Sequence, residues 1–236
     1  METLTGKVAV VTGGTRGIGR AIAERLLREG TSVAICGRTR ESVDRAVNGL
    51  EAFGGKIVGH SADITDPGQV SRFFQAVDET LGAVEILVNN AGAGVFRKVA
   101  EMTIEEWHRN IDLNLNGAFY CCREALTRFH QRGGGFVINI TSLAGKSPFT
   151  GGAGYNASKF GLNGFSEALL LDHRQDNVRV SYIMPGSVAT EFSDRSGDTS
   201  WMIAPEDVAE VVATVLRMPA RTMVSRVELR PSRPKK

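Results

Sequence analysis

The chain has 236 residues, of which 42% are hydrophobic and 23% are charged, and its formal net charge is +2 at pH 7. The charges are spread along the sequence and no apolar run approaches the roughly 18 residues of a membrane span, so we expect neither a nucleic-acid nor a membrane partner. The length suits an α/β domain, and we predict a single domain over residues 1–230 followed by a short basic tail over 231–236.

The predicted strands are short apolar runs rich in β-branched residues, and longer segments with helical periodicity separate them. They cover residues 7–12, 32–36, 56–61, 85–90, 136–141, 178–184 and 223–229. Nearly continuous apolar strands are typical of a parallel sheet that is buried on both faces. We therefore predict an α/β fold of the Rossmann type, a doubly wound parallel sheet of about seven strands with helices on both faces.

Several helix starts are readable from capping residues. Thr103 and Glu106 form a T-x-x-E capping box, Pro67 begins a helix expected over 67–81, and Pro205 precedes acidic residues that suit a first turn. The stretch DLNLNG at 112–117 is awkward for the helix that it interrupts, because asparagine competes with the backbone for hydrogen bonds and glycine costs about 1 kcal/mol relative to alanine. A local rule broken without local benefit suggests a functional site.

The cysteines and histidines form no recognisable ligand set. Cys36, Cys121 and Cys122 make no CxxC motif, and the four histidines stand singly along the sequence, so we expect no disulfide framework and no metal site. The N-terminal residues also lack the pattern of a secretory leader. These observations favour a reducing, cytoplasmic compartment.

The segment TGGTRGIGRAIAERLLREG at 12–30 follows the first strand and opens a helix. Gly13 suits a turn with positive φ, Gly17 permits close approach of a ligand to the backbone, and Gly19 allows the helix to pack against the sheet. The free N–H groups at the start of that helix would face a pyrophosphate. In this context the glycines predict dinucleotide binding, whereas the alternative is a helix-capping loop without a ligand.

Tyr155 and Lys159 lie four residues apart in YNASK, so they share one face of a helix. The ordinary pKa values of tyrosine and lysine are about 10 and about 10.4. A nearby ammonium favours the phenolate, and we expect Lys159 to lower the pKa of Tyr155 toward the range useful for proton transfer. Carbonyl reduction requires such a proton at the oxygen. The small residues at 151–154 would let a cofactor approach, or would form a flexible entry to the helix.

Taken together, these motifs resemble the short-chain dehydrogenase/reductase family, in the branch with the glycine spacing G-x-x-x-G-x-G. The family order is kept by TGGTRGIG at 12–19, NNAG at 89–92, NLNG at 114–117, ITSLAG at 140–145, YNASK at 155–159 and PGSVAT at 185–190. The resemblance covers nearly the whole chain. Within the family, the chain is similar to 3-oxoacyl-[acyl-carrier-protein] reductase-like oxidoreductases. The chain departs from many members after VELRP, where it lacks their Gly-rich closing segment.

The residues after the second predicted strand indicate which nicotinamide cofactor the resemblance implies. Gly37 stands where NAD-dependent relatives usually have aspartate, and Arg38 follows it. A guanidinium can bind a 2′-phosphate in a bidentate manner, with Arg16 on the other side, or each arginine is a solvated loop charge. We predict NADP(H).

The resemblance also implies contacts for other cofactor residues. It places Asp63 at the adenine and Asn90 at the ribose, although either residue could simply form a turn. It places the Val188 backbone and the Thr190 side chain at the nicotinamide carboxamide. The complete expected set is Gly13, Thr15, Arg16, Gly17, Ile18, Gly19, Arg38, Asp63, Ile64, Asn90, Ala91, Gly92, Tyr155, Lys159, Pro185, Gly186, Val188 and Thr190.

Four residues form the catalytic set that the resemblance implies. Tyr155 donates the proton, and Lys159 tunes the tyrosine and binds the ribose hydroxyls. Ser142 donates or shares a hydrogen bond with the substrate oxygen, or is only a cap or turn serine. Asn114 marks a helix kink and an ordered water in a proton relay, whereas Asn116 has no family match and is interpreted as structural.

The substrate pocket is less defined by the sequence. The polar stretch 193–201 is a candidate lid. Apolar candidates for the pocket are Val95, Leu143, Phe149, Met184, Phe192 and Trp201. They favour a carbonyl substrate with an apolar portion.

We expect NADPH-dependent reduction of a ketone or aldehyde, with a 3-oxoacyl thioester suggested by family analogy. One alternative is an NAD-dependent alcohol or polyol dehydrogenase, which Gly37 and Arg38 disfavour. Another is a nucleotide-sensing protein without turnover. Relatives commonly form homodimers or homotetramers through helices that match 103–132 and 153–172, and we expect one of these assemblies.

Overall fold

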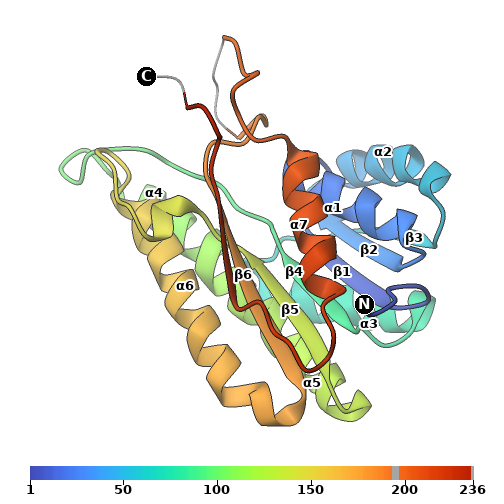
Figure 1. Ribbon diagram of the computed structural model, residues 1–236. Coiled ribbons are helices and arrows are strands. Elements are labelled where there is room, and N and C mark those ends of the chain that lie inside the picture. Colours follow the sequence, from blue (N-terminus) through green and yellow to red (C-terminus); the bar gives the residue numbers. More distant parts are fainter. Residues whose placement is uncertain (193–196, 235–236) are drawn as a thin grey trace.

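The computed structural model describes residues 1–192 and 197–234. These residues form a seven-stranded parallel sheet with the order β3-β2-β1-β4-β5-β6-β7 (Figure 1). The strands are β1 (Val8–Thr12), β2 (Ser32–Gly37), β3 (Ile57–Ser61), β4 (Ile86–Asn89), β5 (Gly135–Ile140), β6 (Val178–Pro185) and β7 (Arg226–Leu229). The predicted fold class is confirmed, and each predicted strand is present.

The helices alternate with the strands along the chain. They are α1 (Gly17–Arg28), α2 (Arg40–Leu50), α3 (Pro67–Leu81), α4 (Ile104–Ile111), α5 (Gly117–Arg132), α6 (Ala153–His173) and α7 (Pro205–Leu216). A π-helical stretch, Asp112–Asn116, joins α4 to α5. Within the described ranges, no helix has the length and apolar character needed to cross a membrane.

Strand residues alternate between two apolar cores, one on each face of the sheet. In β1, Ala9 and Val11 pack in the core that also contains residues of α1, α2 and α7. Val8 and Val10 point the other way, into the core shared with α3, α5 and α6. Successive side chains of a strand point to opposite faces, so helices on both faces require apolar residues at every position. This explains the uninterrupted apolar runs of the sequence.

The expected helix starts are present. The Thr103 hydroxyl accepts a hydrogen bond from the backbone N–H of Glu106 at 3.2 Å, and the Glu106 carboxylate accepts one from the N–H of Thr103 at 3.1 Å. Asp66 caps α3 by accepting hydrogen bonds from the first-turn N–H groups. These side chains satisfy backbone donors that have no partner inside the helix. They therefore locate the helix ends that the sequence predicted.

The strand order reverses between β1 and β4, which are neighbours in the sheet although they are far apart along the chain. The connections from β1 and β4 consequently lead to opposite sides, and the loops at their carboxyl ends separate. Ligands of open α/β sheets bind in the crevice at such a point. The topology therefore places the glycine loop after β1 beside the NNAG turn after β4.

Candidate active site

A cleft with a volume of about 2300 Å³ lies at the carboxyl ends of the strands. Its walls come from the loops that follow β1 to β6, together with Tyr155 and Lys159 of α6. Most of the predicted site residues line it. Two of them do not, because Gly19 and Asn114 lie behind the residues that form its surface.

The glycine loop has little room for side chains. Gly13 has a φ of +63°, and a Cβ atom there would lie 2.8 Å from the Cα of Ala91. A Cβ atom at Gly19 would lie 2.3 Å from the carbonyl oxygen of Gly13 and from Nδ2 of Asn90. Real Cβ atoms do not approach other atoms so closely. Gly19 therefore allows close packing of the glycine loop against the Asn90 turn, whereas the sequence predicted a role in packing the helix against the sheet.

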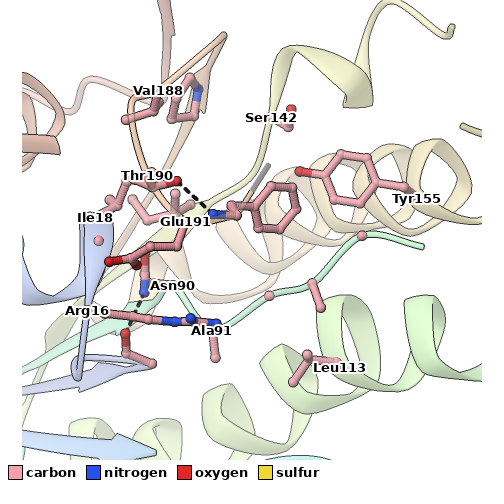
Figure 2. A pocket seen from close by; sticks show the side chains of 18 of the residues that line it. Arg16, Ile18, Asn90, Ala91, Leu113, Ser142, Tyr155, Val188, Thr190 and Glu191 are labelled. Atoms are coloured by element: carbon pink, nitrogen blue, oxygen red, sulfur yellow. Dashed lines mark hydrogen bonds between the residues drawn. The ribbon is translucent and has the colours of Figure 1, made fainter. Parts of the chain in front are cut away.

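Asn90 ties the turn after β4 to the glycine loop. Its Nδ2 donates hydrogen bonds to the carbonyl oxygens of Thr12 at 3.0 Å and Gly13 at 3.2 Å. Figure 2 shows Asn90 with one hydrogen bond that it makes in the cleft. The hydroxyl of Thr12 accepts hydrogen bonds from the backbone N–H groups of Asn90 and Ala91. These contacts fix the two loops that face each other across the reversal of strand order.

The start of α1 faces the cleft without a capping side chain from its N-cap residue, Arg16. Arg16 and Arg38 both line the cleft, as does Thr15. A Cβ atom at Gly37 would lie 2.7 Å from Cγ2 of Thr15. Any larger residue at position 37 therefore requires Thr15 to move.

Asp63 forms a turn, which was the alternative to adenine binding in the sequence-based interpretation. Its Oδ1 accepts hydrogen bonds from the backbone N–H and the hydroxyl of Thr65, at 2.9 Å and 2.8 Å. Asp63 also lines the cleft. The turn and the cleft-facing position are therefore compatible.

Ser142 and Tyr155 lie together in the cleft, Ser142 two residues after β5 and Tyr155 in the first turn of α6. The Tyr155 hydroxyl points into the cleft (Figure 2). Burial raises the pKa of Tyr155, and a hydrogen bond with Ser142 opposes that rise. Ser142 also accepts a hydrogen bond from the N–H of Ala144 at 3.1 Å, so it caps the turn Leu143–Gly145 as well.

The pKa of Tyr155 is raised and not lowered as the sequence predicted, because burial outweighs the groups that favour the phenolate. The Lys159 ammonium lies over the tyrosine ring, 5.8 Å from the ring centroid, and donates a hydrogen bond to the carbonyl oxygen of Ile140 at 3.1 Å. Burial lowers the pKa of Lys159 itself to about 8. Loss of hydration disfavours the charged form of both groups, which moves the tyrosine pKa up and the lysine pKa down.

The interrupted helix has a structural explanation. The π-helical stretch turns Asn114 inward, where Nδ2 donates hydrogen bonds to the carbonyl oxygen of Ala93 at 2.8 Å and to the hydroxyl of Ser158 at 3.0 Å. Oδ1 accepts a hydrogen bond from the N–H of Ala93 at 3.0 Å. Asn116 bonds Asp112 within the same stretch, in line with a structural role. A Cβ atom at Gly117 would lie 2.7 Å from Cδ1 of Ile64, so this glycine has a packing role.

Several pocket expectations need correction. Leu143, Phe149, Phe192 and Trp201 line the cleft, whereas Val95 and Met184 do not. Met184 is only 1% exposed, because it packs in the interior below the cleft floor. Phe96 lines the cleft and was missed by the sequence analysis, which had no signal for it beyond a lone aromatic residue after the NNAG turn.

The glycines before Tyr155 face protein atoms instead of the cleft. A Cβ atom at Gly154 would lie 2.7 Å from Nδ2 of Asn110, and one at Gly152 would lie 2.8 Å from the ring of Phe149. Neither glycine lines the cleft. The expectation that they let a cofactor approach is therefore wrong, and they instead allow close packing of α6 against its neighbours.

Part of the predicted lid, 193–196, lies outside the described residues, and Trp201 at its end lines the cleft. In the predicted basic tail, Pro231 and Pro234 also line the cleft. The histidines do not all stand singly either. The rings of His130 and His173 lie 5.4 Å apart, and both side chains contact the carboxylate of Asp176.

Comparison with known proteins identifies the class. The family model described as short chain dehydrogenase matches residues 7–201. The chain belongs to this family, and it is an oxidoreductase acting on CH–OH or C=O groups, as the sequence predicted.

The chain is similar to individual members over most of its length. It is 35% identical to the glycine betaine reductase ATRR of Emericella nidulans over 97% of this chain, but it spans only 19% of that protein. It is 36% identical to a 3beta-hydroxysteroid dehydrogenase of Mediterraneibacter gnavus, over 80% of this chain and 69% of that one. A metagenomic short-chain oxidoreductase, solved in complex with NADP, has a TM-score of 0.87 at 35% identity and covers 99% of this chain and 100% of its own.

Proposed function

We propose that this protein reduces a ketone or aldehyde to an alcohol with NADPH. The observation that carries the proposal is that one cleft holds the Ser142 and Tyr155 hydroxyls together with the uncapped start of α1. The two hydroxyls suit a carbonyl oxygen, and the helix N-terminus suits a pyrophosphate. The cleft therefore offers a site for the carbonyl that accepts the hydride and a site for the cofactor that supplies it.

The residues fit a dinucleotide with a 2′-phosphate. Gly13 and Gly19 leave the loop backbone free of side chains, and Gly37 carries no carboxylate that would repel the phosphate. Arg16 and Arg38 line the cleft and can pair with such a phosphate. The similarity to an oxidoreductase solved with NADP supports this cofactor.

Bound NADPH would supply the hydride to the carbonyl carbon. Tyr155 then transfers its hydroxyl proton to the carbonyl oxygen, so that one O–H bond breaks as another forms. Burial raises the pKa of Tyr155, which keeps the phenol protonated and ready to donate at neutral pH. Ser142 donates a hydrogen bond to the oxygen as negative charge develops on it.

Lys159 and Asn114 support the tyrosine in this proposal. The buried ammonium of Lys159 lies near the ring and stabilises the phenolate that remains after proton transfer. It also offers donors to the ribose hydroxyls. Asn114 holds the Ala93 segment against α6 through its contacts with Ala93 and Ser158, and it supports resupply of the proton.

We further propose a homo-oligomer built through α5 and α6. Phe119 and Phe160 are each 45% exposed on these helices, and Leu171 is 64% exposed. Covering these side chains with a second copy would remove apolar surface from water. Light scattering coupled to size-exclusion chromatography tests this assembly, and a monomeric mass would contradict it.

The test of the activity follows the loss of reduced-nicotinamide absorbance with NADPH and with NADH across ketones, aldehydes and 3-oxoacyl thioesters. We expect turnover with NADPH and a loss of about 10²-fold or more in Tyr155→Phe, which retains the ring but not the proton. Tyr120→Phe, on α5 away from the cleft, is the matched control. Tight NADPH binding without turnover of any carbonyl would contradict the proposed reaction.

A further inference from the structure

Two phenylalanines pack against the proposed proton donor, and a third packs against one of them. The Phe96 ring centroid lies 5.5 Å from that of Tyr155 and 5.6 Å from that of Phe149. The Phe192 centroid lies 5.7 Å from Tyr155 and 6.4 Å from Phe96. We call Phe96, Phe149 and Phe192 the aromatic wall. They come from three separate loops, so only the fold brings them together.

The aromatic wall is about half exposed, whereas the Tyr155 side chain beside it is mostly buried. Phe96, Phe149 and Phe192 are 45%, 47% and 44% exposed, while Tyr155 is 8% exposed. All four residues line the cleft. Apolar rings left half open at a concave site lose contact with water only when a ligand covers them.

Buried asparagines hold two of the loops in place. Asn110 accepts a hydrogen bond from the N–H of Val95 at 3.1 Å and donates one to the carbonyl oxygen of the same residue at 3.3 Å, next to Phe96. Asn156 accepts a hydrogen bond from the N–H of Phe149 at 3.4 Å and donates to the carbonyl oxygen of Ala144. The scaffold therefore positions the segments that carry Phe96 and Phe149.

These observations favour one class of substrate. We infer that the carbonyl substrate carries an aromatic or alicyclic ring beside the reacting carbon, and that the aromatic wall binds this ring. The inference rests on the proposed function of the cleft. A ring next to the carbonyl places apolar area against the phenylalanines while the oxygen meets the Ser142 and Tyr155 hydroxyls. A small polar ketone leaves the rings uncovered.

The reaction balances as a hydride transfer. The carbonyl carbon gains hydride from NADPH, its oxygen gains the Tyr155 proton, and solvent returns a proton to the phenolate. The products are NADP⁺ and the ring-substituted alcohol, which is secondary when the substrate is a ketone. No other oxidant or reductant enters.

The experiment compares acetophenone and cyclohexyl methyl ketone with acetoin and a 3-oxobutanoyl thioester, all with NADPH. For the wild type we expect kcat/KM at least tenfold higher for the ring ketones than for acetoin. In Phe96→Ala and Phe149→Ala the ratio of acetophenone to acetoin should fall at least tenfold, mainly through a higher KM for acetophenone. Val99→Ala is the control, because Val99 is 76% exposed on the same segment after β4 as Phe96 but does not line the cleft, and it should leave the ratio unchanged.

Binding of acetophenone to the NADPH-saturated Tyr155→Phe variant, measured by saturation-transfer NMR, separates the two proposals. Binding that Phe96→Ala weakens, together with no turnover of any carbonyl by the wild type, would support the ring site and overturn the reductase. Turnover that prefers acetoin or the thioester would support the reductase and overturn the ring site. An equal loss of acetophenone and acetoin turnover in Phe96→Ala would overturn the ring site as well.

Discussion

Lys159 reaches across the face of the Tyr155 ring to the carbonyl oxygen of Ile140, with its ammonium nitrogen 5.8 Å from the ring centroid. The two residues are four positions apart, and their closeness follows from one turn of helix. Their electrostatics follow from burial, which moves the pKa of Tyr155 up and that of Lys159 down to about 8. This pair should therefore leave a signature in the pH dependence of stability.

We expect the charged form of Lys159 to lower the free energy of unfolding below pH 8. This destabilisation should become smaller as the pH rises. The folded protein loses this proton near pH 8 and the unfolded chain near 10.5, so between these values the unfolded state binds more protons and stability increases with pH. The free energy of unfolding of the wild type relative to Lys159→Met should rise by about 2 to 3 kcal/mol from pH 7 to pH 10. Urea unfolding at each pH measures this difference. A flat difference would contradict the lowered pKa.

The buried cysteines should produce a pH dependence of the opposite sign. Burial raises the pKa of Cys36 and of Cys122 from 9.0 to about 12. The unfolded chain then loses these protons first, so stability is complete below pH 9 and falls as the pH rises toward 12. At pH 10 each thiol should lower the free energy of unfolding by about 1 kcal/mol. In the Cys36→Ala variant the free energy of unfolding should therefore fall less steeply with pH than in the wild type.

The same burial should protect the thiols from chemical modification. Cys36, Cys121 and Cys122 are at most 1% exposed. An aromatic disulfide reagent should label them only as fast as the protein opens, and added urea should accelerate the labelling in parallel with unfolding. Immediate stoichiometric labelling at neutral pH would contradict this arrangement.

Position 37 offers a test of the cofactor preference. We expect Gly37→Asp to weaken NADPH binding by charge repulsion and not to gain NADH binding, because its Cβ would lie 2.7 Å from Cγ2 of Thr15. Thr15→Ser removes that methyl group and keeps the hydroxyl. The double variant should bind NADH at least tenfold more tightly than Gly37→Asp alone, as fluorescence titration can measure. Equal NADH affinity in the two variants would show that Thr15 is no obstacle.

Asn114 should matter for stability as well as for turnover. Asn114→Leu removes the partners of both backbone groups of Ala93 and should cost about 2 to 4 kcal/mol of unfolding free energy. Asn116→Ala removes one hydrogen bond, to Asp112, and should cost about 1 kcal/mol or less. Chemical denaturation of the two variants compares neighbouring asparagines in the same π-helical stretch. Equal costs would contradict the role assigned to Asn114.

Local pattern was enough to predict the elements. Apolar runs predicted each strand, and most strand ends lie within one residue of the prediction. The last strand is the exception, since it begins at Arg226 and not at residue 223. Pro67 and the capping residue Thr103 marked the starts of α3 and α4, because such residues act within their own turn of helix.

Most of the site residues that the motifs predicted line the cleft, because the carboxyl ends of parallel strands meet at one edge of the sheet. The motifs did not show that Gly19 and Asn114 lie behind the surface, or that Phe96 lies on it. The motifs also did not predict the contact between the His130 and His173 rings. The two residues are far apart in the sequence, and the ends of α5 and α6 bring their rings together.

The sequence by itself determined the alternation of strands and helices, the family and the residues available for chemistry, because periodicity and motif spacing act over a few turns of chain. Only the tertiary structure decided the direction of the Tyr155 pKa, the crowding of Gly37 against Thr15 and the aromatic wall. Hydration, steric exclusion and ring packing depend on distances in space, and the residues that set those distances come from loops remote in the sequence.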